Sequence, residues 1–266
     1  MRVTSLYRYP VKSMLGESVR ELAVDPAGAR GDRRWALIDT QTGHIASAKQ
    51  ARLWRTLLQC TAADDGADVR IGLPDGGTLM AGDTDAAARL SEFLGRPVDL
   101  LAIRPAGATL ERADPEQVLD QGWDAEVDSP LIELAEVAPG DSFVDYAPLH
   151  VVTTSTLEHI GVEAARYRPN IVLECPAGTP PYSENDWAGR VLTIGGARLQ
   201  VLTATPRCVV PTLEHGALPR DQRALRTPAA ENRVPSINGD VLPCAGVYLE
   251  VHNAGVLRVG DSADVD

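Results

Sequence analysis

The chain has 266 residues, of which 44% are hydrophobic and 23% charged, so it can bury one large core or two modest ones. Its net charge of −12 argues against sequence-independent binding to nucleic acid or to anionic membranes, which needs clustered cations. No run reaches the ~18 uninterrupted apolar residues of a membrane helix, and the first residues lack the apolar stretch of a signal peptide. We therefore expect a cytoplasmic protein with no nucleic-acid partner and no membrane attachment.

The first half of the chain is predicted to be rich in strands. Its β-branched or alternating runs are separated by Gly, Asp and Pro, and they cover residues 3–11, 18–25, 34–39, 57–62 and 69–74. One helix is predicted from Thr84 to Leu94, with Asp83 or Thr84 as its N-cap and Gly95 at its end. Residues 104–130 have weak periodicity and are interpreted as a connector.

Strand patterns begin again after this connector. They cover residues 149–152, 170–174, 191–204, 246–251 and 256–261. A short helix capped by Thr153 or Thr154 follows the first of them, and the third is a hairpin that turns at Gly195 and Gly196. The pattern predicts a mainly β protein with some helix (α+β), made of two barrel-like or sandwich-like units, 1–115 and 116–266.

The four cysteines (Cys60, Cys175, Cys208 and Cys244) form no CxxC pair, so neither a zinc ribbon nor an iron–sulfur site is indicated. Cys208 follows a predicted strand, between Pro206 and Pro211. Arg207 precedes it, and a neighbouring cation favours the thiolate, which is the form that binds metals. Taken alone, a cysteine beside an apolar run is more often a buried structural residue.

Several loops carry residue types that bind phosphate. Lys12 and Ser13 follow the first strand, Arg33 and Arg34 follow a glycine, and Ser47 lies close to Lys49. Lys12 and Lys49 are the only lysines in a chain with 25 basic residues, and a compact ammonium is suited to gripping a phosphate. Solvated charges at strand ends are the alternative interpretation of each loop.

Three further residues bear on a possible site. Arg168 and Asn170 stand at the entry to a strand and offer hydrogen-bond donors and an acceptor in a small space, although a structural ion pair would explain the arginine equally well. His215 is the histidine nearest to Cys208 in the sequence, and we expect it to be a histidine of a surface loop. The chain has no Walker, GxGxxG, HExxH or GxSxG motif.

Six segments, taken in order, resemble the MOSC family, named for the C-terminal domain of molybdenum cofactor sulfurase. The segments are YPVKS, GDRRW, ASAKQ, YRPNIV, PRC and the terminal GVYLEV…GVLRVGD. The pattern is most similar to the subgroup with an N-terminal β-barrel domain, which includes the mitochondrial amidoxime-reducing component and its bacterial relatives. The resemblance implies a MOSC β-barrel domain after the first one, with a cofactor cleft between the two.

The resemblance also implies a molybdenum ion carried on molybdopterin, with Cys208 as its protein ligand and as the catalytic residue. Matching the motifs residue by residue places the other cofactor contacts on both halves of the chain. They are Lys12, Ser13, Arg33, Asp145, Arg168, Asn170, Arg207 and Tyr248.

Three functions follow from this resemblance. The first is an oxidoreductase that removes oxygen from a small N-hydroxylated substrate. Since the chain carries no flavin or iron–sulfur motif, its electrons are expected from a separate reductase. The second is a sulfur transferase that carries a persulfide on Cys208, and the third is a non-catalytic cofactor carrier.

Overall fold

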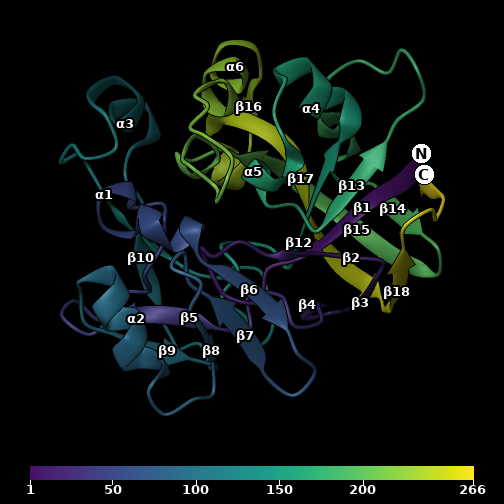
Figure 1. Cartoon of the computed structure of the whole chain (residues 1–266). Coiled ribbons are helices and arrows are strands. Elements are labelled where there is room, and N and C mark those ends of the chain that lie inside the picture. Colours follow the sequence, from purple (N-terminus) through teal and green to yellow (C-terminus); the bar gives the residue numbers. More distant parts are fainter.

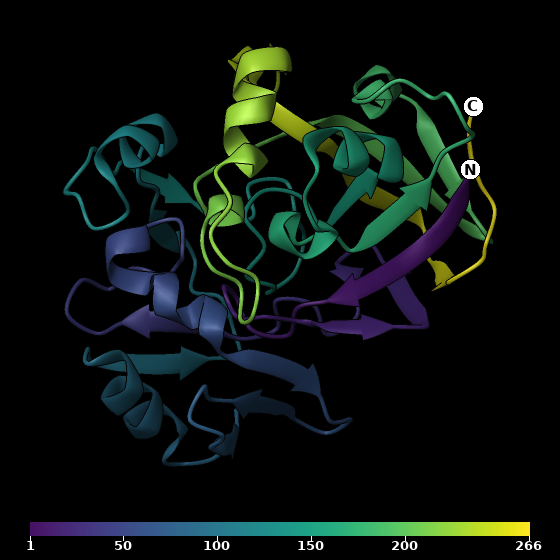
Figure 2. The same ribbon diagram turned by 45° about the horizontal axis from the view of Figure 1, so that its top comes forward.

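The computed structural model describes residues 1–266 and confirms an α+β protein. Two lobes lie side by side (Figures 1 and 2). The large lobe is built on a nine-stranded sheet, and the small lobe holds the shorter sheets from β5 to β11. The two chain termini lie together on the large lobe, where the Ala263 N–H donates to the Met1 carbonyl at 2.9 Å. No helix is both long enough and apolar enough to cross a bilayer.

The large sheet has the strand order β19-β14-β15-β17-β12-β13-β1-β2, with β16 beside β17. Its pairs are antiparallel except for β12 and β13. The strands are β1 (Arg2–Arg8), β2 (Glu17–Val19), β12 (Leu149–Thr153), β13 (Ile171–Glu174), β14 (Val191–Ile194), β15 (Ala197–Pro206), β16 (Arg233–Pro235), β17 (Val241–Asn253) and β19 (Ala263–Val265).

A three-stranded sheet completes the large lobe. It contains β3 (Glu21–Asp25), β4 (Gly28–Ala29) and β18 (Gly255–Arg258). Leu22 and Val24 alternate with more exposed residues along β3, so one face of that strand joins the same apolar core as Leu6 and Leu249. The strands β1 and β3 therefore pack with the second half of the chain, whereas Val11 and Met14 between them join the core of the small lobe. The expected division at residue 115 stays a prediction.

The small lobe has its own core, in which Trp54, Leu37 and Leu90 are buried together. Its strands are β5 (Ala36–Asp39), β6 (Thr61–Asp64), β7 (Val69–Gly72), β8 (Thr78–Met80), β9 (Val98–Leu101), β10 (Thr109–Glu111) and β11 (Leu131–Glu133). Its helices are α1 (Ala51–Trp54), the 3-10 helix η1 (Arg55–Gln59), α2 (Ala86–Leu94) and α3 (Pro115–Gln121).

The helices of the large lobe are short and connect its strands. They are α4 (Thr154–Ile160), α5 (Ala164–Tyr167), η2 (Ser183–Trp187), η3 (Val210–Thr212), α6 (Arg223–Glu231) and η4 (Ile237–Gly239). The Thr153 hydroxyl accepts a hydrogen bond from the Thr156 N–H, which confirms Thr153 as the N-cap of α4. The predicted turn at Gly195 and Gly196 is also confirmed.

The expected barrels are not closed. On the side of β1 away from β13, β2 pairs with residues 6–8. At the start of β1, only an isolated bridge joins Arg2 to Ser262, just before β19. No continuous ladder can therefore join β1 to β19. Three local predictions were also wrong. Residues 57–59 belong to η1 instead of a strand, and residues 104–130 contain β10 and α3. The N-cap of α2 is Asp85 instead of Asp83 or Thr84.

Candidate functional site

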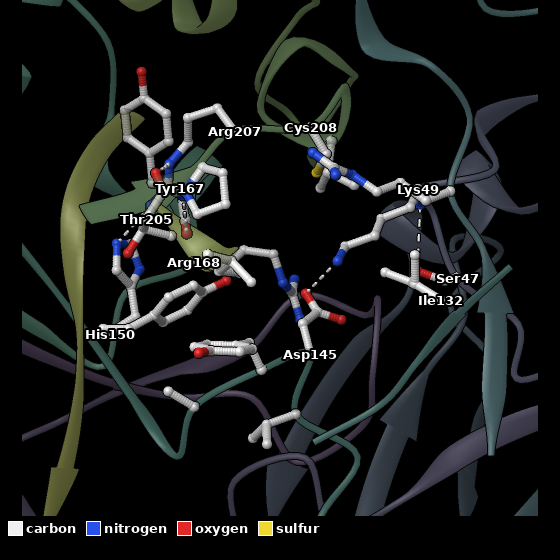
Figure 3. A pocket seen from close by; sticks show the side chains of 18 of the residues that line it. Ser47, Lys49, Ile132, Asp145, His150, Tyr167, Arg168, Thr205, Arg207 and Cys208 are labelled. Carbon is white, nitrogen blue, oxygen red and sulfur yellow. Dashed lines mark hydrogen bonds and ion pairs between the residues drawn. The ribbon is translucent and has the colours of Figure 1, made fainter. Parts of the chain in front are cut away.

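A cavity of about 430 Å³ is lined by segments of both lobes (Figure 3). Its walls carry seven lysine and arginine side chains against four carboxylates, in a chain whose net charge is strongly negative. All nine site residues predicted from the sequence line it. They are Lys12, Ser13, Arg33, Asp145, Arg168, Asn170, Arg207, Cys208 and Tyr248. The structure thus brings the predicted set together, and the role of each residue in binding or catalysis stays a prediction.

Cys208 lies on the cavity wall immediately after β15. The Arg207 N–H donates to the Pro243 carbonyl at 2.8 Å, which ties this segment to β17. Pro206 and Pro211 restrict the backbone on either side of the thiol. Cys208 is half-exposed, whereas Cys60 and Cys244 are buried. It is the single cysteine that lines the cavity, and it also packs against the apolar cluster that contains Val209 and Leu213.

The backbone of the cavity is strained at three of the predicted residues. Ser13, Arg33 and Arg168 have φ angles of 65°, 45° and 53°, in the left-handed region that non-glycine residues rarely adopt. Such strain persists only where surrounding contacts hold it. The Ser13 hydroxyl accepts from the Ala48 N–H at 3.0 Å, and the Arg33 N–H donates to the Tyr9 carbonyl at 2.7 Å.

Asp145 joins the two lysines of the chain. Lys12 Nζ lies 2.6 Å from one carboxylate oxygen. Lys49 Nζ lies 3.0 Å from the other (Figure 3). Although burial opposes it, the charges of Lys12 and Lys49 hold the pKa of Asp145 far below its usual range. Burial lowers the pKa of Lys12 to about 8, and Asp145 limits that shift. Both lysines thus already have a carboxylate partner.

Arg33 and Arg168 both lie over the ring of Tyr9, with guanidinium carbons 4.6 and 4.4 Å from its centroid. Arg33 is paired with Asp32, and its Nη2 donates to the Arg168 carbonyl at 3.1 Å. Arg168 Nη1 donates to the Met14 carbonyl at 2.6 Å, but the buried Nη2 has no partner. An unpaired buried donor costs free energy, so this atom marks a position where a ligand acceptor would fit.

Arg207 is held by a histidine that the sequence did not single out. Arg207 Nη2 donates to His150 Nε2 at 2.8 Å and also contacts the Ala245 carbonyl. His150 must therefore be neutral, with its proton on Nδ1. Burial and the charge of Arg207 lower the pKa of His150 well below its usual value. Gly246 (φ +75°) lets β17 pass close by, since a Cβ there would collide with His150.

This arrangement predicts an acid-sensitive stability. The unfolded chain takes up a proton on His150 as the pH falls through about 6.5, whereas the folded chain does not. Stability contributed by this group is therefore present above that pH and lost below it, by at most about 1.4 kcal/mol per pH unit. In denaturant titrations from about pH 7.5 to about pH 5, His150→Gln, which keeps an acceptor for Arg207, should lose less stability than the wild type. If the unfolding free energies of the two proteins changed equally with pH, His150 would not be neutral in the folded chain.

Two tyrosines form an aromatic wall of the cavity. The ring centroids of Tyr146 and Tyr248 are 5.6 Å apart, and that of His150 lies 6.1 Å from Tyr248. Burial and the nearby charge of Asp145 raise the pKa of Tyr248, so its phenol stays protonated and can donate a hydrogen bond.

The chemistry of the cavity fits an anionic cofactor that brings its own metal ligands. The chain has no group of three or more His, Cys, Asp or Glu side chains that could hold a metal ion alone. It offers instead one thiol, Cys208, together with several cations and the unpaired Nη2 of Arg168. A thiolate is a suitable protein ligand for a soft metal, and arginine is suited to phosphate.

The expectation for His215 was wrong. Its side chain is buried, with 3% of its surface exposed, and it does not line the cavity. Burial lowers its pKa to about 4. The predicted set also omitted other polar residues of the wall, among them His150, Arg112 and Tyr146. Ser47 and Lys49 line the cavity as well, and they had been noted only as phosphate-binding types.

Comparison with protein families gives two matches. A model described as the MOSC N-terminal beta barrel domain matches residues 1–89, and a model described as the MOSC domain matches residues 138–264. The mitochondrial amidoxime-reducing component 1 of Mus musculus is 25% identical over 97% of this chain and 80% of its own length. The mitochondrial amidoxime reducing component 2 of Homo sapiens is 28% identical over 45% of this chain and 37% of its own length.

Among solved structures, the YuaD protein from Bacillus subtilis aligns with 99% of this chain and 94% of its own, with a TM-score of 0.43 and 11% identity.

Proposed function

Because this chain belongs to the MOSC family, with matches to both MOSC domains and homology to the mitochondrial amidoxime-reducing components, we propose that it is a molybdopterin-dependent oxidoreductase. The observation that carries the proposal is the cavity itself. A half-exposed thiol, Cys208, shares it with a set of buried and half-buried cations, and the buried Nη2 of one of them, Arg168, has no partner. When bound, the cofactor would supply a metal that exchanges two electrons and accepts an oxygen atom from the substrate.

The residues of the cavity would divide the work of holding this cofactor. Cys208 would bind the metal. Arg168 would bind the phosphate, because its Nη2 is the buried cationic donor left unpaired. Lys12 and Lys49 would add positive charge through Asp145 instead of acting as free cations. Ser13, Arg33, Asn170, Arg207 and Tyr248 would shape the remaining cavity wall.

The proposed reaction is the reduction of an N-hydroxylated compound. The N–O bond breaks, two electrons and two protons are taken up, and the products are the N–H compound and water. The sequence shows no flavin or iron–sulfur motif, so a separate reductase would deliver the electrons. The protonated Tyr248 phenol offers a hydrogen-bond donor on the wall of the same cavity as Cys208.

The proposal is tested by expressing the protein in a host that makes molybdenum cofactor. We expect about one molybdenum and one pterin per chain, since one cavity with one thiol is available. The protein should then reduce benzamidoxime with reduced methyl viologen as electron donor. A folded protein without metal or pterin would contradict the proposal. A persulfide on Cys208 in that protein would favour sulfur transfer instead.

A further inference from the structure

The cavity differs in charge between its buried part and its rim. Three of its four carboxylates, Glu133, Glu136 and Asp240, belong to exposed residues, and none of them takes part in an ion pair or a side-chain hydrogen bond. The buried cations Lys12 and Arg207 lie among the other lining residues. Every lysine and arginine of the wall is buried or half-buried, so the exposed charges of the cavity are all negative.

The rim carboxylates come from two separate parts of the chain. Glu133 ends β11, and Glu136 follows it, while Asp240 lies between η4 and β17. Glu133 and Glu136 fall between the two domain matches, which end at residue 89 and resume at residue 138. The sole unpaired cation from that intervening segment in the cavity wall is the half-buried Arg112. The rim thus keeps an excess of negative charge.

The aromatic wall lies close to this rim. The Val137 N–H donates to the Tyr146 carbonyl at 3.3 Å, which holds the segment that carries Glu136 beside this tyrosine. Burial raises the pKa of Tyr146, and the charge of Glu136 raises it further. Tyr146 in turn contacts Tyr248. Aromatic faces beside carboxylates attract flat cations, because both the ring quadrupole and the negative charges favour a positive group.

We propose that Glu133, Glu136 and Asp240, together with the face of Tyr146, select flat cationic or basic substrates and disfavour anionic ones. This inference rests on the proposed function, because it assigns the substrate class of the same cavity. The buried cations hold the anionic cofactor, and the acidic rim repels a second anion that would compete for them. The cavity would therefore bind an anionic cofactor at its cations and a cationic substrate at its acidic rim.

The test compares three benzamidoximes that differ in one para substituent, namely trimethylammonio, methyl or carboxylate. With the cofactor-loaded protein, kcat/KM should be about tenfold or more higher for the cation than for the anion, with the neutral compound between them. Raising salt from about 20 mM to about 300 mM should reduce that ratio severalfold. Equal kcat/KM values for cation and anion at low salt would overturn the inference.

Variants show whether the rim causes this preference. Glu133→Gln, Glu136→Gln and Asp240→Asn combined should bring the cation-to-anion ratio to within about threefold. A matched control removes three exposed, unpaired carboxylates that do not line the cavity, by Glu92→Gln, Asp99→Asn and Glu158→Gln. The control protein has the same net charge and should keep the wild-type ratio. An equal loss of preference in both triple variants would overturn the assignment to the rim.

A second measurement separates this inference from the proposed reaction. The matching para-substituted benzamides have no N–O bond, so their binding to the loaded protein is followed by calorimetry without turnover. A lower dissociation constant for the trimethylammonio compound than for the carboxylate, lost in the rim variant, supports the inference even if no benzamidoxime is reduced. Binding without charge preference overturns it, whether or not reduction occurs.

Discussion

Replacing Cys208 by alanine is expected to remove molybdenum from the protein and to lower N-reduction by more than about 100-fold. Groups that merely support a metal ligand already cost 10- to 100-fold when mutated, so loss of the protein ligand itself should cost more. No other cysteine lines the cavity, and no group of histidines or carboxylates stands ready to replace the thiolate. Elemental analysis, pterin content and benzamidoxime reduction measure the effect.

Cys175→Ala is the matched control for this experiment. Cys175 is also partly exposed, but it follows β13 and does not line the cavity. It should keep both metal and activity. Since the Cys208 side chain is half-exposed, its removal should change the unfolding free energy by no more than about 1 kcal/mol. A Cys208→Ala protein that retains full molybdenum and activity would show that the thiolate is not the metal ligand.

The sequence predicted more of the candidate site than of the fold around it. Residue type and position relative to strands pointed to Lys12, Arg168 and Cys208, and the order of the motifs joined them into one cavity. His150 was missed because a lone histidine in an apolar strand gives no local signal. Its role comes from Arg207, which is 57 positions away in the sequence.

The pairing of the strands was the part of the fold that local patterns could not supply. Alternation identified β1 and β3, but it carries no information about partners. These strands pair with β13 and β18, which both lie in the second half of the chain. Residues 57–59 show a similar limit. Leu57 and Leu58 are both fully buried, and a short apolar run of this kind fits a 3-10 turn as well as a strand.

Acidic residues also acquired roles that the sequence did not suggest. Asp145 was predicted as a cofactor contact, yet its two oxygens are occupied by Lys12 and Lys49. Because both lysines already pair with Asp145, the cation best placed to bind an anion is Arg168, whose Nη2 has no partner. The structure shows which cations already have ion-pair or hydrogen-bond partners, and this cannot be learned from residue type alone.

Arg168→Lys should therefore weaken cofactor retention more than any other single change among the cations. Arg168 is the half-buried cation whose buried Nη2 has no partner, and it lies over Tyr9 while donating to the Met14 carbonyl. Lysine keeps the charge but loses the planar fork and the stacking, which should cost about 1.5–3 kcal/mol, or roughly 10- to 100-fold in affinity. The left-handed φ at this position is equally unfavourable for both residues, so backbone strain does not confuse the comparison.

Arg96→Lys separates loss of the cofactor from loss of stability. Arg96 also lies over an aromatic ring, that of Trp54, and it donates two hydrogen bonds to Asp39, but it is remote from the cavity. Both variants should unfold at lower denaturant concentration than the wild type, whereas only Arg168→Lys should lose pterin during gel filtration. Equal pterin content in the two variants would mean that the Arg168 guanidinium does not hold the phosphate, and that its strained backbone and its place over Tyr9 serve the packing between the lobes.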